Sequence, residues 1–250
     1  NNFGFFWIDD TSATNLTIDN SGLPFPFLIT GPLHVENQYE IMTNWGLLLN
    51  GKYRETNMDS GIVNYVEKNQ INCNFAIDSQ PYGTFGASCK AALEYPADNY
   101  LILNGDTIFL ADLVSIYKLF LGKTELPFLI LKKIDRNNRY GGYYLDQGKF
   151  IYSNNDAGNI SLGAYFISNS ELFRRWRLST KSDLTYQNIK EFKEFPLMND
   201  QDCLGLEPIN GECLEPNVPF IDIGIKEAFI SAQKEIPYII NRYNKSISKM

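Results

Sequence analysis

The sequence is short of the residues that most metal and nucleophilic centres use. Its 250 residues include one histidine, His34, and four cysteines with no Cys-x-x-Cys pair. A zinc site of His and Cys ligands is therefore excluded, and any catalytic triad would have to be built around His34 alone. The four cysteines are too scattered for a disulfide scaffold, which favours free thiols. We expect chemistry that uses carboxylates and a hard cation, or none.

Long apolar runs and an excess of basic residues are also lacking. No run approaches the roughly 18 apolar residues that cross a bilayer, so no membrane partner is expected. Residues 3–8 are apolar but lack a preceding basic segment and a small-residue cleavage site, so we expect no signal peptide and a cytoplasmic protein. Acidic residues outnumber basic ones by 29 to 22, which argues against nucleic acid as a partner, because phosphate binding needs a basic face. The strongest cationic cluster, residues 174–177 (RRWR), is either a solvated helix end or a phosphate clamp.

What the sequence does contain is an alternation of short apolar runs with longer amphipathic stretches. The runs that fit buried strands lie at residues 3–8, 45–49, 74–77, 100–103 and 128–131. Helices are predicted at residues 33–43, 61–68, 86–93 and 110–121. This order is typical of an α/β fold with a mostly parallel twisted sheet that is flanked by helices.

The second half of the chain departs from this alternation. Residues 143–167 show shorter strands with glycine-containing turns, which predicts a small antiparallel extension. Residues 179–216 are a polar stretch with one helix at 185–195, followed by a last strand at 218–221 and a terminal helix at 226–243. No shift in composition divides the chain, so we expect residues 1–250 to form a single domain.

Acidic residues follow three of the expected strands. Asp9 and Asp10 follow the first, Asp106 follows the fourth in an Asn-Gly-Asp sequence, and Asp222 follows the last in Asp-Ile-Gly. Ligands of open α/β sheets bind outside the carboxyl ends of the strands, where carboxylates can hold Mg²⁺ beside a substrate phosphate. The alternative is that each aspartate only caps a helix or opens a turn.

Five segments resemble the sugar-1-phosphate nucleotidyltransferases, with the mannose- and heptose-1-phosphate guanylyltransferases of surface polysaccharide synthesis as the nearest branch. Residues 101–109 (LILNGDTIF) and 220–229 (FIDIGIKEAF) carry the resemblance. Residues 80–87 (QPYGTFGA) are similar to the family's E-P-L-G-T-G-G-A, residues 138–141 (NRYG) to its S-R-Y-G turn, and residues 161–165 (SLGAY) to its N-x-G-x-Y strand. The matches span nearly the whole chain.

The resemblance implies a GT-A-type, Rossmann-like fold and nucleotidyl transfer from a nucleoside triphosphate to a sugar 1-phosphate, in capsule or lipopolysaccharide biosynthesis. It implies Mg²⁺ as cofactor, held by Asp106 and Asp222, which are then also the catalytic residues. The other implied site residues divide by ligand: Gly83, Thr84, Asp9 and Asp10 for the nucleotide, and Ser161, Gly163 and Tyr140 for the sugar. In such a site the metal and basic side chains stabilise charge as the sugar phosphate attacks the α-phosphorus and pyrophosphate leaves.

The expected phosphate loop departs from the family pattern. The family opens with L-A-G-G-x-G-T-R-L, six further residues and L-P-K-P, and residues 8–16 (IDDTSATNL) and 23–26 (LPFP) keep that register without a gap. The residues that replace its three glycines, its arginine and its lysine are Asp10, Thr11, Ala13, Asn15 and Phe25. Each added Cβ obstructs the approach of backbone N–H groups to a phosphate. Losing two cations removes about 3–6 kcal/mol, or roughly 10²–10⁴ in rate or binding.

Three interpretations therefore stay open. The first is an active transferase with an altered nucleotide site, supported by the retained Asp106 and Asp222. The second is a catalytically silent relative, a pseudoenzyme that binds a nucleotide sugar or regulates an active partner subunit. The third keeps the fold but transfers a glycosyl group from a nucleotide sugar, which needs less grip on a triphosphate. The partner is a nucleotide or nucleotide sugar in each case, and a homodimer or a heteromer with an active relative is the assembly considered.

Overall fold

The computed structural model describes residues 27–30, 82–104, 107–109, 111–123, 125–134, 141–154, 158–181 and 198–222, together with residues 228, 231, 232 and 235. The elements expected at residues 3–8, 33–43, 45–49, 61–68, 74–77 and 185–195 lie outside this set. Of the terminal helix expected at 226–243, the four described residues are all helical. Within the described part of the chain, no helix combines the length and the apolar character needed to cross a bilayer.

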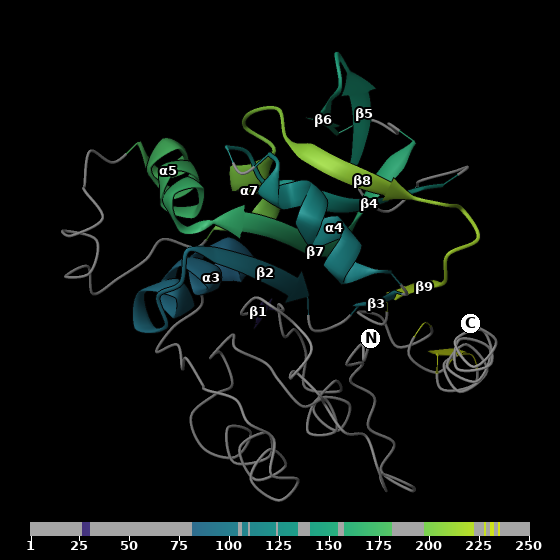
Figure 1. Cartoon of the computed structure of the whole chain (residues 1–250), viewed down its shortest axis with the longest axis horizontal. Helices are drawn as coiled ribbons and strands as arrows, with labels where there is room; N and C mark the ends of the chain where they lie inside the picture. The colour runs from purple at the N-terminus through teal and green to yellow at the C-terminus, as the bar shows by residue number, and fades with distance from the viewer. Residues whose placement is uncertain are drawn as a thin grey trace, which may run out of the picture.

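Five strands lie along the main path of a seven-stranded sheet, in the order β1-β2-β7-β4-β8 (Figure 1). Their bounds are Phe27–Thr30 (β1), Asn99–Asn104 (β2), Asn159–Ser168 (β7), Phe128–Lys133 (β4) and Asn210–Leu214 (β8). β1 pairs parallel with β2, and β4 pairs parallel with β8. β7 lies antiparallel between β2 and β4, so the described sheet has more antiparallel pairing than the sequence predicted. The other four strands point the same way, and the α/β class is confirmed.

Shorter antiparallel pieces complete the described strands. β5 (Gly142–Asp146) and β6 (Lys149–Ser153) form a hairpin, and β5 also pairs with β7, which confirms the antiparallel extension predicted at 143–167. Gln147 and Gly148 join the hairpin with φ angles of 46° and 77°, and two successive positive φ angles suit a two-residue turn that follows the twist of the strands. A separate two-stranded sheet contains β3 (Thr107–Phe109) and β9 (Phe220–Asp222).

Helices cover both faces of the main sheet. Their bounds are Gly83–Glu94 (α3), Leu113–Leu121 (α4), Asn169–Thr180 (α5) and Asp200–Leu204 (α7). Successive strand residues point to opposite faces, so Leu101 of β2 packs in a core with Phe120 of α4, whereas Tyr100 packs in a second core beneath α3, α5 and α7. Strands buried on both faces explain why the predicted runs at 100–103 and 128–131 are apolar throughout.

Candidate functional site

Asp222 lies beside the segment that carries the Asn-Gly-Asp sequence. In the antiparallel pair of β3 and β9, Asp222 is opposite Thr107, the residue that follows Asp106 in the chain. Asp106 itself lies outside the described residues, as do Asp9, Asp10 and Tyr140. Lys132 on β4 donates from Nζ to the carbonyl of Val218, which ties the segment before β9 to the main sheet. Burial lowers the pKa of Lys132.

The two described residues predicted to bind the sugar lie at a bulge in β7. Ile130 of β4 pairs with Ala164, but its neighbour Leu131 pairs with Ser161, so Leu162 and Gly163 are extra residues in β7. Gly163 has a φ of 66°, and its N–H donates to Oγ of Ser161 at 3.2 Å. A bulge of this kind locally disrupts the ladder and bends the strand.

The same bulge contacts β3, the strand that pairs with β9. Thr107 donates from Oγ1 to the carbonyl of Leu162 at 3.1 Å, and Thr107 is also the partner of Asp222 in the β3–β9 register. The structure therefore brings Asp222, Ser161 and Gly163 to one edge of the sheet, next to the end of β2.

Asn104, the last residue of β2, is a site residue that the sequence analysis did not single out. Its amide is packed against Gly163 so closely that a Cβ added at Gly163 would lie 2.5 Å from its Nδ2. Its Oδ1 is buried and has no hydrogen-bond partner in the structure. An unsatisfied buried acceptor is costly, so this oxygen suits a donor or a cation from a ligand. The available signal was its place as the first residue of Asn-Gly-Asp.

Gly83 and Thr84, the residues predicted to face the nucleotide base, begin helix α3. The helix runs antiparallel to β2, because the Tyr100 hydroxyl near the start of β2 contacts the carbonyls of Ala92 and Tyr95 at the other end of α3. A helix of 12 residues and a strand of six are both about 20 Å long. The first turn of α3 therefore lies toward the carboxyl-terminal end of β2.

Residues 198–200 cover this first turn, a contact that the sequence analysis missed. The Met198 carbonyl accepts hydrogen bonds from Phe85 N at 3.0 Å and Gly86 N at 3.2 Å, and Met198 N donates to the Tyr82 carbonyl at 2.7 Å. Thr84 is buried, and its Oγ1 accepts a hydrogen bond from Asp200 N at 3.0 Å. The polar stretch 179–216 offered no local pattern that could have predicted these bonds.

The Asp200 carboxylate accepts a hydrogen bond from the buried Tyr165 hydroxyl, with 2.7 Å between Tyr165 Oη and Asp200 Oδ1. Burial raises the pKa of Asp200 to about 6, although the hydrogen bonds from Tyr165 and Thr84 oppose that shift. Burial likewise raises the pKa of Tyr165 well above its usual value. The titratable and charged groups around this pair are Cys89, Tyr143, Arg175, Asp202 and Cys203.

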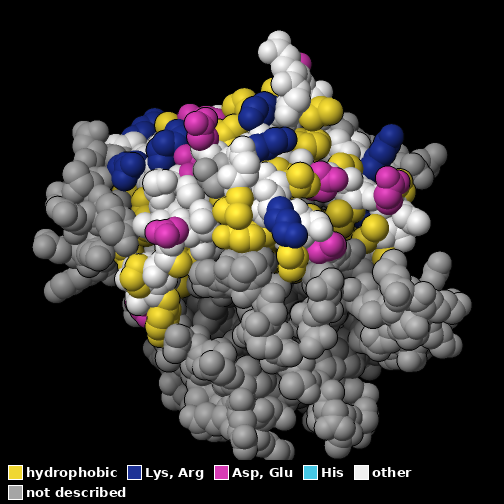
Figure 2. Space-filling view, viewed as in Figure 1, with side chains coloured by type: hydrophobic (Ala, Val, Ile, Leu, Met, Phe, Trp, Pro, Cys, Tyr) yellow, Lys and Arg dark blue, Asp and Glu magenta, His cyan; other side chains and the backbone are white. Residues whose placement is uncertain are grey.

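The arginines of residues 174–177 that the sequence offered as a phosphate clamp are held by carboxylates instead. Arg175 is fully buried, donates from Nε to Glu171 at 2.7 Å, and contacts the carbonyls of Leu204 and Pro208. Arg174 pairs with both Glu171 and Glu207, and it lowers the pKa of Glu207. Both expectations are therefore wrong for Arg175, which is buried, whereas the side chain of Arg174 stays 40% exposed while it pairs with the two glutamates. Figure 2 shows basic side chains interspersed with acidic ones on the visible face of the described residues.

Known proteins resemble this chain in sequence and in fold. No protein-family model matches the chain. The D-glycero-alpha-D-manno-heptose 1-phosphate guanylyltransferase of Aneurinibacillus thermoaerophilus is 30% identical over 179 residues, which cover 68% of this chain and 70% of that protein. The enzyme of the same description from Campylobacter jejuni subsp. jejuni serotype O:2 is 27% identical over 167 residues, covering 64% of this chain and 65% of that protein.

A solved structure shares the fold. HddC from Yersinia pseudotuberculosis, crystallised in complex with GMP-PN, superposes with a TM-score of 0.57 at 18% identity, over 85% of this chain and 99% of that one. The architecture is thus that of the Rossmann-like nucleotidyltransferases. The chain belongs to the sugar-1-phosphate nucleotidyltransferase family, and the resemblance that its sequence motifs predicted is confirmed.

Proposed function

We propose that this protein transfers a nucleotidyl group from a nucleoside triphosphate to a sugar 1-phosphate with Mg²⁺, in the synthesis of nucleotide sugars for capsule or lipopolysaccharide. The observation that carries the proposal is the register of β3 and β9, which sets Asp222 opposite the residue that follows Asp106. Family membership supports the reaction class. The curated relatives' printed description, heptose 1-phosphate guanylyltransferase, supports a sugar 1-phosphate and a guanine nucleotide as the first substrates to test.

The donor set at this edge of the sheet fits a magnesium ion. Mg²⁺ prefers oxygen ligands and is usually held by one or two carboxylates plus substrate phosphates. Asp106 and Asp222 would hold the ion, and the unsatisfied Asn104 Oδ1 adds a further oxygen close by.

The chain's own residues would orient the two substrates. The missing side chain at Gly163 lets the Asn104 amide pack against the bulge, and the backbone around Ser161 and Gly163 would then face the sugar. Gly83 and Thr84 would shape the site of the base from the first turn of α3. The bound ion would supply positive charge to the phosphates, and in-line attack by the sugar phosphate then depends on how these elements hold both substrates.

A second candidate function is favoured by the altered phosphate loop. Asp10, Thr11, Ala13, Asn15 and Phe25 replace the glycines and cations of the family loop. The fold does not compensate through Arg174 or Arg175, because Glu171 and Glu207 hold both guanidiniums. A relative that binds a nucleotide sugar without turnover, alone or as the regulatory partner of an active subunit, is consistent with that loss.

The test combines ligand-dependent melting with a pyrophosphate-release assay. Under the first proposal one nucleoside triphosphate with Mg²⁺ raises the melting temperature, and addition of the matching sugar 1-phosphate releases pyrophosphate. Asp106→Asn and Asp222→Asn should each reduce that release by about a hundredfold or more, because each removes a charge that stabilises the reacting phosphates. Asp146→Asn, an exposed carboxylate on the β5–β6 hairpin, is the matched control and should leave it unchanged.

Each result separates the candidates. Stabilisation by nucleotide sugars without pyrophosphate release supports the silent relative. Release of the nucleoside diphosphate from a nucleotide sugar in the presence of an acceptor points to glycosyl transfer. Unchanged pyrophosphate release in both aspartate variants would show that the metal assignment is wrong.

A further inference from the structure

The conformation of the first turn of α3 depends on the segment that covers it, residues 198–200. Gly83 has a φ of 73°, and a Cβ added there would collide with the Met198 backbone. The N–H groups of Phe85 and Gly86, which the first turn of a helix leaves without a partner within the helix, donate to the Met198 carbonyl. These groups are therefore committed to the covering segment and are not offered to a ligand.

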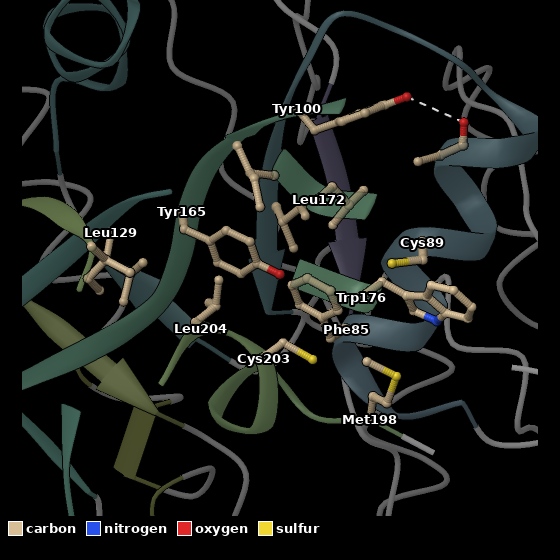
Figure 3. Close-up of a cluster of buried hydrophobic side chains, with 14 of the residues drawn as sticks. Phe85, Cys89, Tyr100, Leu129, Tyr165, Leu172, Trp176, Met198, Cys203 and Leu204 are labelled. Atoms are coloured by element: carbon tan, nitrogen blue, oxygen red, sulfur yellow. Dashed lines mark hydrogen bonds between the residues drawn. The ribbon is translucent and has the colours of Figure 1, made fainter. Parts of the chain in front are cut away.

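Asp200 fastens the covering segment at its other end. Its N–H donates to Thr84 Oγ1, and its carboxylate accepts from the Tyr165 hydroxyl on β7, so Asp200 joins α3 to the central sheet. Figure 3 shows Phe85, Tyr165, Met198 and Cys203 gathered in the same part of the core. Burying a carboxylate lowers the free energy of unfolding unless hydrogen bonds or charge partners compensate for its lost hydration. This cost favours a role for Asp200 in fixing one arrangement of the covering segment.

We propose that Asp200 is a positioning residue for the nucleotide: through Thr84, and through the Met198 backbone beside Gly83, it holds the first turn of α3 in the shape that receives the base. This inference rests on the proposed function, because it requires a nucleotide to bind at that turn. Asp200 itself lies in the covering segment, and it acts on the ligand only through Gly83 and Thr84.

Two substitutions test the inference by altering the Tyr165–Asp200 contact from either side. Asp200→Asn removes the charge and keeps the backbone bond to Thr84, and Tyr165→Phe removes the hydroxyl that the carboxylate accepts from. Each should weaken binding of the preferred ribonucleoside triphosphate with Mg²⁺ by about tenfold, the scale of one hydrogen bond to a charged group. The double variant should be hardly worse than Tyr165→Phe alone, since both substitutions act on the same contact. Affinity for hexose 1-phosphates should stay within about twofold.

The control is Tyr100→Phe. Tyr100 is as buried as Tyr165, and its hydroxyl bonds to the carbonyls of Ala92 and Tyr95 at the far end of α3. Tyr100→Phe therefore removes a buried tyrosine hydroxyl from the same core without altering a contact of residues 198–200. Calorimetric titration of the four ribonucleoside triphosphates and of hexose 1-phosphates measures each affinity, and Tyr100→Phe should bind both as the wild type does.

The outcomes keep the two proposals apart. A wild type that binds a triphosphate, with unchanged affinity in Asp200→Asn and Tyr165→Phe, overturns the positioning role and leaves the proposed function standing. An equal loss in Tyr100→Phe, or an equal loss of sugar phosphate binding, also overturns it, because the effect is then general destabilisation. A wild type that binds no triphosphate overturns the proposed function and this inference together. If Asp200→Asn does not fold, Tyr165→Phe and Tyr100→Phe decide the question.

Discussion

At the residue scale, replacing Gly163 separates the free-energy cost of backbone strain from the cost of steric crowding at the candidate site. Its φ of 66° costs any L-residue about 1–2 kcal/mol, and a Cβ would also collide with Asn104. Gly158 on the same chain segment has a φ of 77° but nothing within 4 Å of an added Cβ. Urea unfolding should therefore show that Gly163→Ala loses about 1–3 kcal/mol more stability than Gly158→Ala. Equal losses would mean that Asn104 moves aside without cost.

At the same scale, some candidate site residues could be recognised in the sequence and others could not. Asp222 and Gly163 fall in motifs, so the sequence alone marks them as candidate site residues. The part that Asp200 plays could not, because its bond to Thr84 joins residues 116 positions apart and Met198 contributes only backbone groups. A backbone contact of that kind leaves no signature in residue type.

At the scale of secondary-structure elements, α4 shows how a cap sets a boundary. The sequence predicts a helix over 110–121, but the helix begins at Leu113 because Asp112 caps it and accepts hydrogen bonds from Ser115 N at 3.0 Å and Ser115 Oγ at 2.7 Å. Those bonds lower the pKa of Asp112, led by the one from the Ser115 side chain. Asp112→Ala should cost about 0.5–2 kcal/mol of unfolding free energy, and Asp112→Asn should cost less.

The pH dependence of that cap has a definite sign. Because the folded pKa of Asp112 is below its usual value, its stabilisation is present at neutral pH and is lost as pH falls through the folded pKa. Chemical unfolding of the wild type and Asp112→Ala at pH 7 and near pH 3 measures it. A difference between them that does not shrink in acid would contradict the assignment of Asp112 as a charged cap.

A helix whose buried face carries an ion pair was harder to predict from the sequence than the apolar strands. Strands β2 and β4 follow from branched and aromatic runs, and both extend no more than two residues beyond the predicted bounds. Helix α5 was not predicted beyond a helix end, because Glu171 and Arg175 occupy its buried face and interrupt the apolar spacing. Their ion pair, buried with the helix, satisfies both charges. Hydrophobic periodicity does not reveal a buried helix face that contains oppositely charged residues paired with each other.

At the scale of the whole molecule, Asp200 should contribute to the pH dependence of the unfolding free energy with the opposite sign to a carboxylate whose folded pKa is lowered. Its folded pKa of about 6 exceeds the usual value near 3.9, so the native state binds more protons than the unfolded state between those two values. The stabilisation from this group is full below about pH 4 and is lost as pH rises through 6. Unfolding free energies at pH 7 and 4.5 should show the wild type gaining relative to Asp200→Asn at the lower pH. A constant difference would mean that Asp200 titrates normally.

The two cores on opposite faces of the sheet divide the ligand site between them. Phe85, beside Thr84, belongs to the core beneath α3, α5 and α7, whereas Phe109 and Phe220 of the β3–β9 pair belong with the core beneath α4. A substrate that touches both the first turn of α3 and Asp222 acts as a cross-link between two separately packed layers. Occupancy would then couple the opening of the two layers, and departure of the product would release that coupling.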